Sequence, residues 1–156
     1  MQCYATSEYA DEYLDGLMNT DAWSGAQASD KERALLSATV HIDALSSLGG
    51  GFRGCKATDG QLQEFPRSPD TVVPEAIKRA CCHEALAILE QSCDKTAQGR
   101  EQAIRQGVAS VSIGGVSESY VKLSDQQSGL RGRLLSDMAM ALIRPYLAVQ
   151  GVFPIV

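Results

Sequence analysis

One stretch of the sequence matches a motif with a defined chemistry, the dinucleotide-binding pattern G-x-G-x-x-G. The match is the run Gly49-Gly50-Gly51-Phe52-Arg53-Gly54. In a nucleotide site these glycines follow a strand and let backbone amides approach a pyrophosphate at the start of a helix. Here a stripe of helical period precedes the run, and no strand–helix–strand unit surrounds it. The sequence therefore favours a flexible connector over a nucleotide site.

The chain has two histidines, His41 and His83, and a catalytic triad would need one of them as its base. His83 lies in the run Cys81-Cys82-His83-Glu84, but successive residues of a helix point about 100° apart and cannot all reach one metal ion. His41 and Asp43 are two positions apart on another helix and also point apart. Neither histidine lies in a recognisable nucleophile motif. We therefore predict structural roles for both histidines, with no catalytic residue, no metal, no cofactor and no enzymatic activity.

Basic side chains that could contact phosphate gather in the second half of the chain. They are Lys95, Arg100, Arg105, Lys122, Arg131 and Arg133. Single-strand binding also uses aromatic side chains that stack on bases, and aromatic residues make up only 6% of this chain. Together with a pI near 5.0, this composition disfavours nucleic acid as the main partner. We expect the basic residues to form a solvated or subunit-facing surface.

The acidic side chains are concentrated at the other end of the sequence. Residues 1–70 hold five basic and eleven acidic side chains, a net charge of −6. Residues 71–156 hold nine basic and eight acidic side chains, a net charge of +1. Such polarity suits head-to-tail or ring assembly, although a solvated acidic face is its commoner cause. The sequence leaves both interpretations open.

Length and composition predict one domain with a core of its own. A chain of 156 residues, 44% of them hydrophobic, buries enough surface to fold without disulfides or a structural metal. The five cysteines lack C-x-x-C spacing, which indicates free thiols that pack as small buried side chains in a reducing cytoplasm. The first thirty residues contain no Lys or Arg, and no apolar run approaches about 18 residues, so we expect neither a signal peptide nor a membrane anchor.

Apolar stripes of helical period predict four helices. The first begins at the N-cap Thr6, the second at the capping box Ser29-Asp30-Lys31-Glu32, and the third at Pro74. The last helix is limited by Pro145 and is expected to be the central core element. The stripes are, in order, Tyr9, Tyr13, Leu14 and Leu17; Leu35, Ala38, Thr39, Ile42 and Leu45; Ile77, Ala80, Cys81, Ala85, Ile88 and Leu89; and Leu134, Leu135, Met138, Ala141, Leu142 and Tyr146.

A change to two-residue periodicity predicts a β-hairpin insertion at about residues 107–122, before the last helix. Its turn is Gly114-Gly115, between strands 108–113 and 116–121. The strands are only half apolar, so the hairpin needs another surface to be stable. Its apolar positions are Val111, Ile113, Val116 and Tyr120.

The C-terminal segment 149–156 is apolar but contains turn and breaker residues, so we expect an extended arm. Docking of this arm on its own core and docking on a partner are both open. The predicted fold is mainly α: a small bundle of about four helices over residues 1–148, with the hairpin or long-loop insertion, followed by the arm. The arm residues expected to dock are Val149, Val152, Phe153, Pro154, Ile155 and Val156.

An ordered series of residues covers nearly the whole chain and carries a family resemblance. It resembles the head-to-tail connector (adaptor) proteins of tailed bacteriophages, a family also labelled putative DnaT-like single-stranded-DNA-binding proteins. Its most specific parts are Ala22-Trp23, Ile42-Asp43, Phe65-Pro66-Arg67 and the helix start Pro74-Glu75-Ala76-Ile77-Lys78. The rest of the series is Tyr4, Ala10, Tyr13, Leu14, Asp21, Lys31 to Leu36, Ala38-Thr39, Gly51-Phe52-Arg53-Gly54, Leu62, Val73, Ala80 and Glu84-Ala85-Leu86.

The resemblance implies a structural virion protein of the head–tail junction, or neck, that is assembled in the cytoplasm of a bacterial host. Family members usually form twelve-fold rings below the portal and continue the DNA channel, so genomic DNA passes through without specific binding. The implied partners are the portal protein, a neck or tail-completion protein and other copies of the chain, with no membrane. Residues 149–156 would grip the portal, and the hairpin would be an inter-subunit or portal-facing element.

The acidic first half suggests where DNA would pass in such a ring. Asp11, Glu12 and Asp15 could line the channel, because like charge prevents DNA from sticking. Two other classes are open. A single-stranded-DNA-binding replication protein would need a basic face and salt-sensitive affinity. A small enzyme using the glycine loop would need a pocket with displaced acid or base groups.

Overall fold

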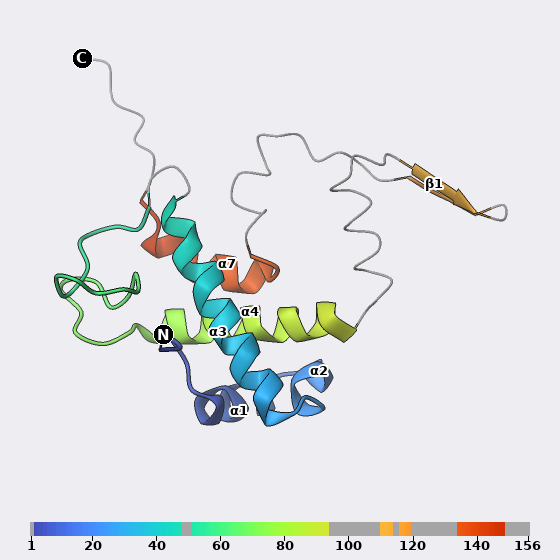
Figure 1. The fold of residues 1–156 in the computed structure, drawn as a ribbon, viewed down its shortest axis with the longest axis horizontal. Helices are drawn as coiled ribbons and strands as arrows, with labels where there is room; N and C mark the ends of the chain where they lie inside the picture. Colours follow the sequence, from blue (N-terminus) through green and yellow to red (C-terminus); the bar gives the residue numbers. More distant parts are fainter. Residues whose placement is uncertain (1, 48–50, 94–109, 114–115, 120–133, 149–156) are drawn as a thin grey trace, which may run out of the picture.

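The fold is given by a computed structural model, which describes residues 2–47, 51–93, 110–113, 116–119 and 134–148 (Figure 1). Its described residues confirm the predicted mainly α fold, with a hairpin before the last helix. No helix among them is long and apolar enough to cross a membrane. The described elements are α1 (Ser7–Asp15), α2 (Asp21–Ser24), α3 (Ala28–Ala44), the 3₁₀ turn η1 (Leu45–Ser47), α4 (Glu75–Cys93), β1 (Ser110–Ile113), β2 (Val116–Ser119), α7 (Asp137–Ile143) and the 3₁₀ turn η2 (Arg144–Tyr146).

Helix α4 is the central element of the core, because α1, α2, α3 and α7 all contact it (Figure 1). The expectation that the last helix is central is wrong, since α7 has seven residues whereas α4 has 19. The carbonyl of Pro74 accepts hydrogen bonds from the amides of Ile77 and Lys78 at 3.0 and 3.2 Å. The helix therefore starts just after Pro74, one residue later than predicted.

The predicted apolar stripes of the second and third helices are confirmed. The four stripe residues in α3 and Leu45 in η1 are all buried, and of the six on α4 only Ile88 is half-buried. The predicted capping box at Ser29 is wrong, because α3 begins at Ala28 with Gln27 as its N-cap. The carbonyl of Gln27 already accepts hydrogen bonds from two amides of the first turn, at 2.9 and 3.0 Å. Ser29 consequently lies inside that turn.

The short helix α1 begins as predicted, with the Thr6 hydroxyl accepting a hydrogen bond from the amide of Tyr9. Its buried face, however, consists of Ala10 and Leu14. Tyr9 and Tyr13 are only half-buried, and Leu17 lies exposed beyond the end of the helix. The tyrosine rings thus lie at the edge of the core, where another molecule can contact them.

Helix α7 presents a different face to the core from the one predicted. It begins after the N-cap Ser136, so Leu134 and Leu135 precede it and do not belong to its helical stripe. Ala139 and Ile143, four residues apart, are its fully buried residues, whereas Met138 is 56% exposed. Of the other predicted stripe residues, Leu134 is buried, Leu142 and Tyr146 are half-buried, and Leu135 and Ala141 are exposed. The predicted stop at Pro145 is confirmed, because α7 ends at Ile143 and η2 follows.

The loop between α3 and α4 is held against the chain that follows α7. The amide of Arg53 donates to the carbonyl of Tyr146 at 2.8 Å, and the amide of Ala148 donates to the carbonyl of Gly51 at 2.9 Å. Gly51 has a positive φ of 67°, which a residue with a side chain rarely adopts. The glycine run is a connector as predicted, and its described part, residues 51–54, is hydrogen-bonded to the chain that follows α7.

The predicted hairpin is confirmed in its described strands. β1 and β2 pair in antiparallel register, with Ser110 opposite Ser119 and Ile113 opposite Val116. Figure 1 draws this pair away from the helices. The turn residues Gly114 and Gly115, Tyr120, the arm 149–156 and the six basic residues of 95–133 lie outside the described residues.

Candidate nucleic-acid interface

Four side chains from α1 and α4 form a group of aromatic rings and cations, which we call the tyrosine–cation cluster. Tyr9 and Tyr13 are four residues apart on α1, so they lie on one face, and their rings stack with centroids 6.3 Å apart at 14°. Lys78 Nζ lies 5.6 Å from the centroid of the Tyr9 ring, and Arg79 Cζ lies 5.6 Å from that of Tyr13. Both cations therefore lie within cation–π distance of a tyrosine.

Glu75, in the first turn of α4, contacts three of the four members of this cluster. Its carboxylate accepts a hydrogen bond from the Tyr9 hydroxyl. It also lies 3.5 Å from Arg79 Nε and 3.8 Å from Lys78 Nζ. The hydrogen bond from Tyr9, and after it the charges of Lys78 and Arg79, lower the pKa of Glu75. Burial, and after it the same hydrogen bond, raises the pKa of Tyr9 to about 12. Near neutral pH the group thus pairs a carboxylate with a protonated tyrosine.

A hollow of about 300 Å³ opens beside the cluster and is lined by Tyr9, Glu12, Tyr13 and Glu75. Rings that stack on bases and cations that contact phosphate are the two components of single-strand binding sites. Sequence analysis missed this combination because Lys78 and Arg79 lie more than sixty residues beyond the tyrosines. Spacing within α1 predicted that the two tyrosines share a face, but it carried no signal for the cations.

The two histidines contact groups on other helices. His83 Nε2 lies 3.1 Å from the Tyr13 hydroxyl, with the two rings edge to face, and burial lowers the pKa of His83. His41 Nδ1 lies 2.8 Å from Glu84. The neighbouring Cys81 points instead toward the Thr39 hydroxyl, 3.6 Å away. The metal-binding residue types of 81–84 thus diverge, as the helical geometry predicted, and the described residues contain no group of three that could hold a metal ion.

The fully buried carboxylate of Glu84 is the group that sequence analysis missed most clearly. Besides its contact with His41, it accepts hydrogen bonds from the amides of Leu135 and Ser136, each at 3.0 Å. It therefore satisfies free amides at the start of α7 from a different helix. The available signal was an acidic residue within the apolar stripe of the third helix, between Cys81 and Ala85.

The three acids that we expected to line a channel lie together on α1. Asp11, Glu12 and Asp15 border a hollow of about 420 Å³ with Trp23, Ser24 and Lys31. Asp11 accepts hydrogen bonds from Lys31 Nζ and from the Trp23 indole, both at 2.8 Å, and these bonds lower its pKa. One of the three acids is thus paired within the chain. Whether the acids face a channel stays a prediction.

The cysteines agree only in part with their predicted burial. The four whose side chains are described are free thiols, as expected. Cys81 and Cys82 are buried, and burial raises the pKa of both thiols. Cys3 is half-buried and Cys55 is exposed, so the expectation of buried side chains is wrong for Cys55.

Comparison with known proteins adds one finding. A family model described as "Putative DnaT-like ssDNA binding protein" matches residues 1–154. The chain belongs to this family. No curated protein and no solved structure gives a significant match. The family description agrees with the second label in the sequence resemblance, and it does not support the identity of a phage connector.

Proposed function

We propose that this member of the DnaT-like family binds single-stranded DNA and has no catalytic activity. The observation that carries this proposal is the tyrosine–cation cluster, in which two half-buried rings lie beside Lys78 and Arg79. Aromatic faces stack on bases of any sequence, and neighbouring cations contact the backbone. The family description independently names the same class of ligand.

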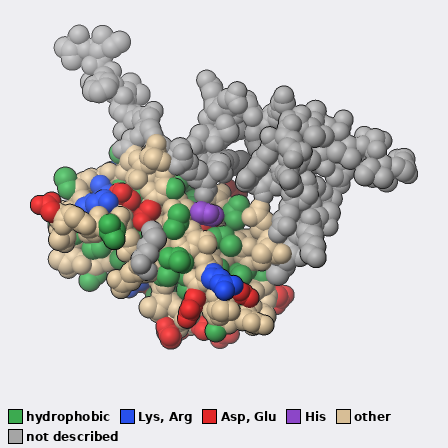
Figure 2. All heavy atoms as spheres, viewed as in Figure 1, with side chains coloured by type: hydrophobic (Ala, Val, Ile, Leu, Met, Phe, Trp, Pro, Cys, Tyr) green, Lys and Arg blue, Asp and Glu red, His purple; other side chains and the backbone are tan. Residues whose placement is uncertain are grey.

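The distribution of charge limits where further DNA contacts lie. Residues 94–133 hold six basic and four acidic side chains, a net charge of +2. The rest of the chain holds eight basic and fifteen acidic side chains, a net charge of −7. On the face in Figure 2, basic side chains lie beside acidic ones and form no continuous basic patch. We therefore place DNA contacts at the cluster and in residues 94–133.

A fluorescence anisotropy titration with a labelled oligonucleotide tests this proposal. We expect binding that weakens as salt rises, with a slope of about 0.7 per phosphate contact, and little dependence on base sequence. Tyr13→Leu is expected to weaken binding because the ring is lost, whereas Leu62→Ala, at an exposed loop residue, is a control expected to have no effect. Absence of binding at low salt would contradict the proposal.

A second candidate function is a head-to-tail connector of a tailed bacteriophage, as the sequence resemblance implies. The observation that favours it is the hairpin, because an isolated two-stranded sheet is only marginally stable and gains from a partner surface. The net charge of −7 outside residues 94–133 also suits a ring through which DNA passes without sticking. In this proposal the chain is a virion component whose partners are its own copies, the portal and a neck protein.

The connector proposal has its own test. Deletion of residues 149–156 is expected to abolish association with portal particles while thermal unfolding of the helical domain stays unchanged. Unchanged association would rule out the arm as the portal-binding element. Electron microscopy of the chain with its portal would show whether a ring forms, and a ring without oligonucleotide binding would favour the connector over DNA binding.

A further inference from the structure

We propose that Glu75 occupies the place of a DNA phosphate in the tyrosine–cation cluster, and that a single strand binds by displacing its carboxylate. This inference rests on the proposed binding of single-stranded DNA. It names the groups that bind the phosphate. It also identifies Glu75 as a side chain that weakens the binding of DNA.

The geometry places three donors around one acceptor. The Tyr9 hydroxyl donates a hydrogen bond to the Glu75 carboxylate, and Arg79 Nε and Lys78 Nζ lie 3.5 and 3.8 Å from its oxygens. A hydroxyl and two cations are also donors that bind phosphate oxygens in protein–DNA interfaces. An incoming phosphate therefore finds a set of donors that is already arranged around an oxyanion.

The position is open to solvent. The side chain of Glu75 is 51% exposed, and those of Lys78 and Arg79 are 35% and 48% exposed. Exposed ion pairs contribute only about 0–1 kcal/mol each, so the two ion pairs of Glu75 cost little to break. The hydrogen bond that Glu75 accepts from the Tyr9 hydroxyl would be replaced by one to the phosphate. A phosphate in this place has the half-buried rings of Tyr9 and Tyr13 beside it, which are the residue type that contacts bases in single-strand sites.

Glu75 competes with phosphate throughout the physiological pH range. Because its neighbours lower its pKa, the carboxylate stays ionised well below neutral pH. It neutralises part of the positive charge that Lys78 and Arg79 would otherwise offer. Wild-type binding is consequently weaker than the donors alone would support.

The test compares Glu75→Gln with Glu90→Gln in anisotropy titrations with a labelled oligothymidylate at several salt concentrations. Both variants remove one negative charge from an exposed position of α4, but only the first removes the competitor. We expect Glu75→Gln to bind about fivefold tighter at low salt, with a salt slope steeper by up to about 0.7. Glu90→Gln is expected to change affinity less than twofold. The glutamine oxygen can still accept the Tyr9 hydroxyl, so we expect the fold to persist, as thermal unfolding would verify.

A second comparison tests whether the effect of Glu75 depends on the two cations, Lys78 and Arg79. In a Lys78→Gln/Arg79→Gln background the Glu75→Gln change is expected to bring no gain in DNA affinity, because no cation remains for Glu75 to neutralise. An equal gain in both backgrounds would overturn the inference.

The outcomes separate this inference from the function on which it rests. Wild-type binding with equal effects of Glu75→Gln and Glu90→Gln would overturn the role of Glu75 and leave DNA binding standing. No binding by either the wild type or Glu75→Gln would overturn both. Altered self-association of Glu75→Gln in size-exclusion chromatography, without altered DNA affinity, would assign the cluster to contact between copies and overturn the inference.

Discussion

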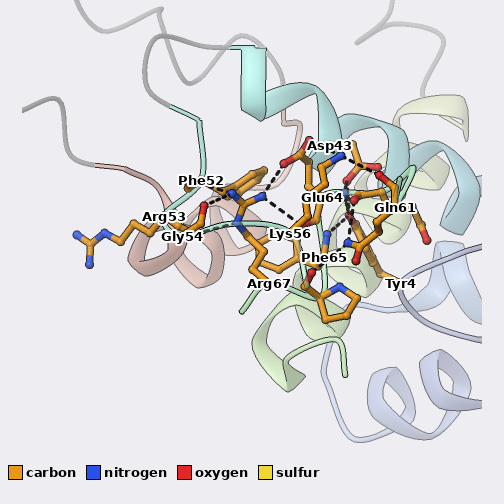
Figure 3. Close-up of polar contacts among 12 residues, drawn as sticks. Tyr4, Asp43, Phe52, Arg53, Gly54, Lys56, Gln61, Glu64, Phe65 and Arg67 are labelled. Carbon is orange, nitrogen blue, oxygen red and sulfur yellow. Dashed lines mark hydrogen bonds and ion pairs between the residues drawn. The ribbon is translucent and has the colours of Figure 1, made fainter. Parts of the chain in front are cut away.

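The guanidinium group of Arg67 holds together the loop between α3 and α4. It donates to the carbonyls of Arg53, Gly54 and Phe52 and to the carboxylate of Glu64, with Nη1 2.7 Å from Oε2 (Figure 3). Its side chain is only 13% exposed, so the guanidinium group makes these hydrogen bonds while largely shielded from solvent. The planar group presents five N–H donors in a fixed geometry, which the three donors of a lysine ammonium cannot reproduce.

Replacement of this arginine is therefore predicted to destabilise the domain although the charge is kept. Arg67→Lys is expected to lower the free energy of unfolding by about 2 kcal/mol, because the lysine ammonium cannot reproduce the hydrogen bonds that the guanidinium group makes to three carbonyls and to Glu64. Urea denaturation measures this change. Arg33→Lys is the matched control, because the Arg33 side chain is 81% exposed and its contact with Asp30 is long, at 3.6 Å. Equal midpoints for the two variants would contradict the structural role of Arg67.

At the scale of secondary-structure elements, α7 is positioned by a residue of another helix. Its own cap, Ser136, accepts a hydrogen bond from the amide of Ala139 at 3.2 Å. The amides just before the helix are satisfied by Glu84 of α4. A helix of seven residues is too short to be stable alone, so this contact and the burial of Ala139 and Ile143 maintain it.

Replacement of the Glu84 carboxyl group is predicted to release α7 before the rest of the domain. Glu84→Gln keeps the size of the side chain, but its amide group presents donors toward the amides that the carboxylate accepted. We expect a loss of about 2 kcal/mol and faster hydrogen exchange in 137–143 than in α3. Glu90→Gln, exposed on the same helix, serves as the control. Uniform exchange across both helices would show that Glu84 does not act on α7 specifically.

At the scale of the whole molecule, the net charge of −5 divides into two parts of opposite sign. Residues 94–133 have a net charge of +2, and the rest of the chain has a net charge of −7. Long-range repulsion from an acidic domain opposes DNA, and salt screens it over about 10 Å. The basic segment is therefore predicted to matter more for affinity than equal charges placed elsewhere.

This prediction can be tested by removing equal charge from the two parts. Lys95→Gln/Arg100→Gln is expected to weaken oligonucleotide binding several-fold and to reduce the salt slope by about 0.7 for each lost phosphate contact. Arg33→Gln/Arg144→Gln makes the same change in net charge on exposed residues of the helical domain. If both pairs weaken binding equally, net charge alone sets the affinity and the basic segment has no special role.

The parts of the fold that sequence analysis predicted correctly are those determined by local periodicity. The stripe from Leu35 to Leu45, the Thr6 cap and the register of the hairpin all depend on residues a few positions apart. The errors concern contacts between elements. The core-facing side of α7 depends on where Ser136 begins the helix, and the role of Glu84 depends on a partner 51 residues away.

By itself the sequence determined that the chain forms a mainly α domain with a hairpin insertion and an uneven distribution of charge. Only the tertiary structure decided that Tyr9 and Tyr13 meet Lys78 and Arg79, and that Glu75 lies among them. The physical reason is that helical spacing orients a side chain only relative to its own axis. Which side chain it meets depends on how α1 packs against α4, and that packing is determined by the whole core.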